Sequence, residues 1–335
     1  MAQGTSDQHG APLRYTLRVP VRTLGENPIL GLESPTVVRI DNLEIAVQAV
    51  PPLLVTTVDG FASESAAAEF IPRVIAGLWG LVVRWNIAFR ANFVPQRITY
   101  ASDPVAAGNN LARSFGQDSG TPVDAIVGGE DTVIFPSGKR LRWLTLGEAR
   151  GIVQTTASLT IPTFKQALSN VHAAALIADE KFKTAIELFN AYFYEASLRA
   201  RFLTVVMILE VLAPSTDKHP AAQALISEWK TQLQRSLAGT SNEDARLALE
   251  ALDRELEFRR ETSIRQRVRQ LARGEFQHLP RSEREELEKD AVKAYDARGT
   301  LIHSGRLPDA DLETLHEQAT RIVRRTLAKR LGIDI

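Results

Sequence analysis

The spacing of apolar residues changes about halfway along this chain, and this change limits the fold more than any other feature. Before residue 150, β-branched residues form short patches between Gly, Pro and Asn, for example at 37–40 and 45–47. Such patches predict short strands. From Pro162 onward, apolar residues recur at steps of three and four, which is the period of an amphipathic helix. The sequence therefore predicts a small N-terminal α+β domain followed by an all-α helical bundle.

The predicted boundaries follow from this change. Residues 1–12 are polar and rich in Gly, Ser and Gln, which predicts a flexible tail. Residues 13–155 form the α+β domain, for which we expect a sensing or regulatory role. Residues 160–335 form the helical bundle.

Three local predictions fall within the α+β domain. Residues 63–85 read as a helix that begins after a Ser63 cap. The stretch 101–129 is rich in Gly, Asp, Asn and Ser and is expected to be a loop. The strand-like runs 132–135 and 140–144 flank Pro-Ser-Gly and predict a β-hairpin.

The helical region shows one long apolar stripe and several capping signals. The stripe begins at Phe182, continues to Leu212 and ends before Pro214, which predicts a single long helix. Capping residues mark three later helix starts and two helix ends (Ser241, Ser282 and Asp309; Gly274 and Gly305).

Composition excludes several kinds of chemistry. The chain has no cysteine, so disulfides, thiolate metal sites and a nucleophilic thiol are ruled out. Its 6 histidines do not follow metal-ligand spacing, and no phosphate-binding GxxxxGK[ST], GxGxxG or GxSxG segment occurs. We therefore expect neither a metal nor a cofactor.

The apolar runs and the charge balance set further expectations. The longest apolar runs, 74–83 and 202–209, are shorter than the ~18–20 residues that span a bilayer, and no signal peptide precedes them. A cytoplasmic protein without a membrane partner is expected. The 40 basic residues balance 40 acidic ones, which argues against non-specific coating of nucleic acid. Two local cationic stretches, 265–273 and 298–306, remain compatible with a phosphate site.

Residues 294–305 carry the most informative segment, Ala-Tyr-Asp-Ala-Arg-Gly-Thr-Leu-Ile-His-Ser-Gly. It resembles the signature of the HEPN superfamily, above all the Apea-like branch, with its Tyr-Asp-x-Arg-small-x-x-x-His-x-Gly pattern. Residues 189–212 resemble the long first bundle helix of that branch, and 263–271 resemble its middle helix. The resemblance covers about residues 180–330 and does not reach the N-terminal domain. A second Arg-x4-His pair, Arg273 and His278, lacks the flanking pattern and is expected to be a decoy.

The resemblance implies a metal-independent endoribonuclease, as in defence or toxin effectors, that works as a homodimer with a shared cleft. Attack of a ribose 2′-hydroxyl on the next phosphate needs proton transfer, which His303 can perform because its ordinary pKa is near ~6.5. Arg298 can stabilise the charge on the phosphoryl oxygens. Asp296 lies on the same helix face as His303 and could orient the imidazole.

The spacing of the Arg–His pair poses a geometric question. Five residues on a regular helix separate Arg298 and His303 by about 140°. Either the helix loosens around Gly299 or a second copy supplies the missing half. Gly299 leaves room for a nucleotide, but active relatives often carry a polar residue at this position.

Other residues have both a functional and a structural interpretation. Glu210 could pair with Arg298 across the bundle as an orienting carboxylate, or be an ordinary salt-bridged core residue. Four arginines are candidates for RNA-backbone binding, or else belong to a solvated helix face (Arg265, Arg267, Arg269 and Arg306). His303 and Arg298 could themselves be structural.

Two rival functions therefore accompany the nuclease hypothesis. The same bundle could be a non-catalytic module that binds RNA or protein, or a purely structural dimeric scaffold. The N-terminal domain could bind a regulatory partner in any of these cases.

Overall fold

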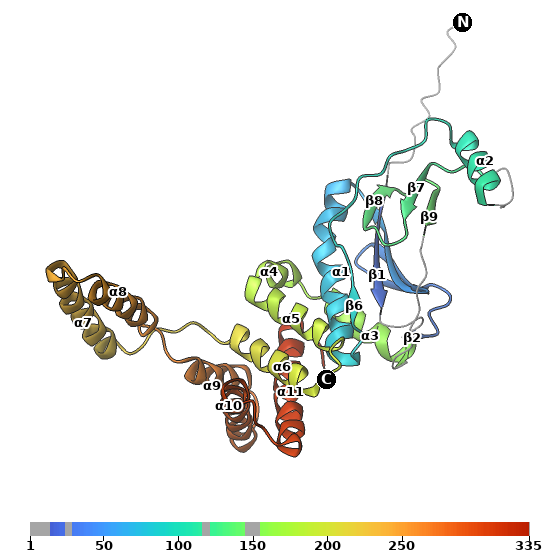
Figure 1. Cartoon of the computed structure of the whole chain (residues 1–335). Coiled ribbons are helices and arrows are strands. Elements are labelled where there is room, and N and C mark those ends of the chain that lie inside the picture. The colour runs from blue at the N-terminus through green and yellow to red at the C-terminus, as the bar shows by residue number, and fades with distance from the viewer. Residues whose placement is uncertain (1–13, 24–28, 116–120, 145–154, 335) are drawn as a thin grey trace, which may run out of the picture. The chain divides into compact units, whose positions relative to one another are not determined.

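The computed structural model describes residues 14–23, 29–115, 121–144 and 155–334, so the predicted tail at 1–12 lies outside the described residues. A sheet-rich N-terminal region precedes a mostly helical C-terminal region (Figure 1). The chain divides into two compact units, residues 1–179 with 327–335, and residues 180–326. The sequence placed the start of the helical domain at 160, but the helices of 157–178 belong to the first unit.

An antiparallel sheet forms the centre of the first unit. Its strand order is β3-β4-β5-β1-β6, and β8 pairs with β1 beside this path. Val19, Ile45 and Val58 lie in the buried core, and β1 is buried along most of its length. The strands of this sheet are β1 (Tyr15–Thr23), β3 (Thr36–Ile40), β4 (Leu43–Val50), β5 (Leu53–Phe61), β6 (Phe89–Arg90) and β8 (Val133–Pro136).

Helix α1 (Glu64–Trp85) packs against this sheet and against α3 (Ala157–Leu168). Ser63 caps it as predicted, because its hydroxyl accepts a hydrogen bond from the Ala66 N–H. Gly77 permits close approach, since a Cβ there would lie 2.9 Å from a ring carbon of Phe164. The prediction of a helix at 63–85 is confirmed.

The predicted hairpin at 132–144 is wrong. Strand β8 pairs with β1, whereas β9 (Leu141–Leu144) pairs in parallel with β7 (Ala125–Gly128). Arg18 on β1 explains this preference, because its guanidinium donates to the Gly129 carbonyl and stacks 3.9 Å above the Trp143 ring. These contacts hold β9 beside β7.

The predicted loop at 101–129 is also wrong in part. It contains α2 (Pro104–Phe115) and strand β7. The missed signal is Asp103-Pro104, because the Asp103 carboxylate accepts from the N–H groups of Val105 and Ala106 and Pro suits the first helical position.

The remaining elements of the first unit are short. Strands β2 (Ile29–Leu30) and β10 (Thr155–Thr156) form a two-stranded parallel sheet, and α4 (Ala173–Ala178) follows α3. The chain's C-terminal residues 327–335 join this unit. There the Asn170 side chain donates to the carbonyls of Arg330 and Leu331, and Gln166 donates to Asp334.

The second unit consists of helices. Its largest fully buried side chains are four phenylalanines, and α6, α9 and α10 pack against one another. The helices are α5 (Glu180–Tyr192), α6 (Leu198–Leu212), α7 (Pro220–Gly239), α8 (Glu243–Phe258), α9 (Ile264–Glu275), α10 (Arg281–Ser304) and α11 (Asp309–Leu331). Helix α11 belongs to this unit up to Thr326, and its residues from Leu327 onward belong to the first unit.

The long helix predicted from Phe182 to Leu212 is interrupted. Helix α5 ends at Tyr192, and α6 begins at Leu198 after the Ser197 cap, whose hydroxyl accepts from the Ala200 N–H. Turn-type bonds such as Tyr194 N–H to the Ala191 carbonyl close α5. The apolar period continues across this break because α5 and α6 pack against each other.

Helices α7 and α8 lie side by side as a hairpin (Figure 1). Backbone hydrogen bonds tie its base together, from Lys218 N–H to the Arg260 carbonyl and from Thr262 N–H to the Thr216 carbonyl. Within the described residues of α8, no side chain is fully buried.

Among the described helices, α1 is long and apolar enough to cross a membrane by length and composition alone. However, 72% of its apolar window is buried inside the protein. Helix α1 is therefore a core helix of the first unit.

Candidate functional site

The Arg–His segment forms the last three turns of α10. The helix is regular through Gly299 and ends at Gly305, whose φ of +66° is the left-handed conformation of a C-terminal cap. The structure thus confirms the helix end predicted at Gly305. Because α10 does not loosen, Arg298 and His303 leave it about 140° apart.

Arg298 forms an ion pair with Glu210 of α6. Its Nε lies 3.3 Å from a Glu210 carboxylate oxygen, and the two side chains are 30% and 19% exposed. The N–H does not point at the oxygen well enough for a hydrogen bond, so the contact is electrostatic. Burial raises the pKa of Glu210, and the Arg298 charge opposes this shift. Glu210 therefore helps to position Arg298 at the surface of the bundle.

His303 is exposed on the last turn of α10. In the part of the chain that the structure describes, its ring makes no hydrogen bond or ion pair. Its neighbour Ile302 is 50% exposed. A Cβ built at Gly299 would have nothing within 4 Å, so the surface beside the motif is open. The imidazole is therefore free to contact another molecule.

The Asp296 carboxylate contacts Arg265 of α9 and not His303. The Nε of Arg265 donates to one carboxylate oxygen at 2.9 Å, and its Nη2 donates to the other at 3.0 Å. The pair raises the pKa of Arg265, chiefly through the hydrogen bonds. The expected orientation of His303 by Asp296 is absent from this arrangement, because the carboxylate is already occupied.

The four candidate RNA-binding arginines do not share one face. Arg267 is only 15% exposed, and it donates to the Pro214 carbonyl at 2.8 Å and to Glu261 at 3.0 Å. These contacts fix α9 to the base of the α7–α8 hairpin and give Arg267 a structural role. Its expected contact with RNA stays a prediction. Arg306 is exposed just beyond the cap of α10. Arg265 and Arg269 point into a groove.

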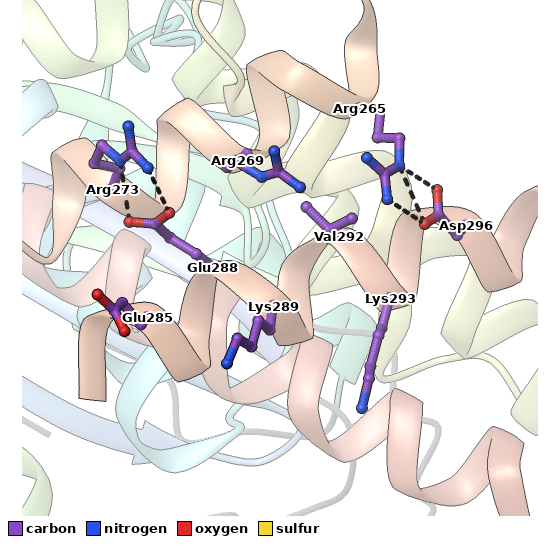
Figure 2. Close-up of a pocket in the computed structure, with 9 residues that line it drawn as sticks. All are labelled: Arg265, Arg269, Arg273, Glu285, Glu288, Lys289, Val292, Lys293 and Asp296. Atoms are coloured by element: carbon purple, nitrogen blue, oxygen red, sulfur yellow. Dashed lines mark hydrogen bonds and ion pairs between the residues drawn. The ribbon is translucent and has the colours of Figure 1, made fainter. Parts of the chain in front are cut away.

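This groove lies between α9 and α10 and has a volume of about 450 Å³ (Figure 2). We call it the α9–α10 groove. Figure 2 shows Arg269 between two ion pairs, Arg265–Asp296 and Arg273–Glu288. The full lining is Arg265, Arg269, Arg273, Glu285, Glu288, Lys289, Val292, Lys293 and Asp296.

Sequence reasoning missed the α10 side of the groove. Lys289 and Lys293 are one helical turn apart, and Glu288 holds Arg273 through two hydrogen bonds of 3.1 and 3.0 Å. Acidic and basic residues are mixed along α10, so its sequence shows no cationic cluster. The four-residue spacing of Lys289 and Lys293 can be read from the sequence. That they share a groove with the arginines of α9 depends on which face of α10 packs against α9.

Neither His316 nor His278 offers a better catalytic centre than His303. His316 is half-buried in α11 and its Nε2 lies 2.9 Å from the Tyr192 hydroxyl, with the two rings stacked. Burial and the Arg201 charge lower the pKa of His316. His278 is exposed near the end of α9. Among the described residues, no group of three or more His, Asp or Glu could hold a metal ion.

Comparison of the chain with family models, curated proteins and solved structures gives no match. Any function must therefore be inferred from the residues of the site itself.

Proposed function

We propose that this chain is a metal-independent endoribonuclease of the HEPN type, in which two copies form one cleft. The observation that carries the proposal is the arrangement of α10, where an exposed His303 and a Glu210-bound Arg298 point in directions about 140° apart. One copy cannot place both side chains on a single phosphate. A symmetric pair of copies can, if Arg298 of one copy and His303 of the other face the same cleft.

The chemistry of the two side chains fits cleavage of an RNA strand. The ribose 2′-oxygen attacks the adjacent phosphorus, its proton passes to a base, and the bond from phosphorus to the 5′-oxygen breaks as that oxygen gains a proton. The two His303 side chains of a symmetric cleft supply one base and one acid. Arg298 stabilises the negative charge of the five-coordinate phosphorus through its N–H groups.

Glu210 has a positioning role in this proposal. Its carboxylate limits the directions that Arg298 can take, yet the Arg298 side chain is 30% exposed and its guanidinium keeps further N–H groups for a phosphoryl oxygen. Gly299 leaves space for a nucleotide next to Arg298. The N-terminal unit would then sense a signal or bind a regulatory partner.

The test is cleavage of single-stranded RNA by the purified full chain in the presence of EDTA. We expect His303→Ala and Arg298→Ala to lower the rate by about 10²-fold or more, as for loss of an acid–base group or a charge stabiliser. His278→Ala is the matched control, since it belongs to the other Arg-x4-His pair. Equal rates for all three variants would reject the proposal.

A non-catalytic RNA-binding module is the second candidate. It is favoured by the Arg298–Glu210 ion pair, which gives the arginine a structural partner, and by Gly299, where active relatives often carry a polar residue. RNA binding without turnover, and unchanged by His303→Ala, would support this candidate.

A further inference from the structure

The α9–α10 groove is separate from the Arg298–His303 pair and has its own charge pattern. Five cationic side chains line it, together with three carboxylates. Each carboxylate already has an arginine partner: Asp296 binds Arg265, Glu288 binds Arg273, and Glu285 accepts from Arg281 at 2.7 Å. The ion pairs of these carboxylates are therefore made with arginines, and the pKa of Glu285 is lowered chiefly by its hydrogen bond from Arg281 and further by the Lys289 charge.

Three cationic side chains of the groove have no ion-pair partner among the described residues. Within the described residues, no carboxylate lies within 4.0 Å of the charged groups of Arg269, Lys289 or Lys293. Lys289 and Lys293 are exposed, and Arg269 lies between the two ion pairs of the groove (Figure 2). All three line the same groove, so an anion that binds there is attracted by all three charges.

The two paired arginines also keep donors for a ligand. Arg265 and Arg273 each use Nε and Nη2 for their carboxylates. A guanidinium has five N–H groups, so the Nη1 edge of each stays available. The side chains are 48% and 63% exposed. The ion pairs thus orient these arginines and leave part of each accessible.

The spacing of the three α9 arginines suits a row of several phosphates better than a single phosphate. Residues 265, 269 and 273 follow at four-residue steps, so they lie about 6 Å apart along α9 and extend over about 12 Å. Val292 is the one apolar side chain of the lining, and the lining has no aromatic ring. The groove therefore offers charge for a row of phosphates but no surface on which a base could stack.

We infer that the α9–α10 groove binds successive phosphates of a single RNA strand, with Arg269, Lys289 and Lys293 as the main contacts. The inference rests on the proposed function only for the identity of this polyanion as RNA. Phosphate contacts fix the position of a strand and do not read its sequence. The groove would hold the strand, while Arg298 and His303 act on it elsewhere on α10.

The test uses the full chain and a fluorescent single-stranded RNA with 2′-O-methyl groups, which cannot be cleaved by 2′-hydroxyl attack. Anisotropy titrations at several salt concentrations compare Arg269→Gln and the Lys289→Gln/Lys293→Gln pair with the parent chain. We expect roughly tenfold weaker binding and a salt dependence reduced by about one unit of slope for each lost contact. Arg235→Gln and Arg254→Gln, on the exposed faces of α7 and α8, are controls that should bind as the parent does.

The outcomes separate this inference from the proposed function. Unchanged RNA affinity in the groove variants, with thermal melts that show intact folding, would overturn the inference even if His303 proves essential for cleavage. Conversely, weaker binding in these variants supports it even if the chain cleaves nothing. Inorganic tripolyphosphate is the second ligand: if it binds the groove and the RNA does not, the assignment to RNA is overturned.

Discussion

The Arg265 guanidinium holds the Asp296 carboxylate through two nitrogens, at 2.9 and 3.0 Å. Asp296 lies two residues before Arg298 on α10. The Arg265–Asp296 ion pair therefore joins α9 to the turn of α10 that contains Arg298. Each side chain is about half exposed, at 48% and 49%. The pair is therefore accessible to solvent and to a competing anion.

Asp296→Asn should free Arg265 for a phosphate. Exposed ion pairs contribute little to stability, so we expect the melting temperature to change by no more than about 3 °C. RNA affinity should rise by about two- to threefold, because a carboxylate no longer competes for the guanidinium. Anisotropy with the uncleavable RNA and a thermal melt measure the two effects. Weaker binding would instead indicate that Asp296 supports the RNA site.

Arg298→Ala should destabilise the bundle in a pH-dependent way. It leaves the Glu210 carboxylate partly buried and unpaired, at a cost of about 1–3 kcal/mol near neutral pH. Burial already raises the pKa of Glu210 above its ordinary value of 4.5, so the folded state binds more protons than the unfolded state just above that pH. The contribution of Glu210 to the free energy of unfolding is therefore lost as the pH rises from about 4.5 through the raised pKa of Glu210.

Urea denaturation at pH 4.5 and pH 7 measures this effect. The variant should lose more stability between the two pH values than the parent chain, since the Arg298 charge no longer opposes the shift. Glu210→Gln combined with Arg298→Ala is the control and should remove the extra pH dependence. If both variants respond to pH alike, Glu210 is not the group that titrates.

His316 and Tyr192 give a second pH prediction with the opposite sign. Burial, together with the Arg201 charge, lowers the pKa of His316 below its ordinary value of 6.5. The folded state therefore binds fewer protons than the unfolded state just below that pH, and stability is lost as pH falls from about 6.5. His316→Gln should show a smaller drop in the denaturation midpoint between pH 7.5 and pH 5. An equal drop in parent and variant would contradict this account.

Much of the fold could be predicted where periodicity and capping agree. The Ser63 cap, the strands around Val19 and Ile45, and the Gly305 helix end follow from local rules that tertiary contacts here reinforce. The break at Ser197 was missed because α5 and α6 continue one apolar period while packing on each other. The predicted hairpin at 132–144 is wrong because its strands pair according to contacts that are distant in sequence. Strand β8 pairs with β1, and Arg18 of β1 binds the Gly129 carbonyl beside β7.

In the candidate site too, local features could be predicted from the sequence and features that depend on helix packing could not. The helical position of Arg298 and His303 followed from sequence, and so did the option of a Glu210 partner. The α9–α10 groove did not, because it depends on which face of α10 meets α9. Arg267 and Arg269 are only two residues apart, yet Arg267 bonds to Glu261 and the Pro214 carbonyl while Arg269 lines the groove. A run of arginines on a helix cannot be assigned to one face by composition.

Two glycines offer a matched pair of stability tests. A Cβ at Gly77 would lie 2.9 Å from the fully buried Phe164 ring, which has little room to move. We expect Gly77→Ala to destabilise the chain by about 1 kcal/mol or more, despite the better helix propensity of Ala. Gly299→Ala meets nothing within 4 Å and should stabilise by about 0.5–1 kcal/mol.

Denaturation curves of the two variants check this contrast, and cleavage assays extend it. If a nucleotide occupies the open space beside Arg298, Gly299→Ala should lower the cleavage rate while it raises stability. A destabilised Gly299→Ala chain would show that the surface there is not open.

Mixing two inactive variants tests whether the cleft is shared. The Arg298→Ala chain keeps His303, and the His303→Ala chain keeps Arg298. At random association about half of the dimers contain one of each. These mixed dimers alone hold both an Arg298 and a His303, although only one of the two histidines that transfer protons. Part of the parent's cleavage rate should therefore reappear on mixing, although neither variant is active by itself. If the two residues acted within one copy, no chain in the mixture would carry both and the activity would stay absent. A mixture of Arg298→Ala with the double variant Arg298→Ala/His303→Ala is the control, because it never contains Arg298 and should remain inactive at any ratio.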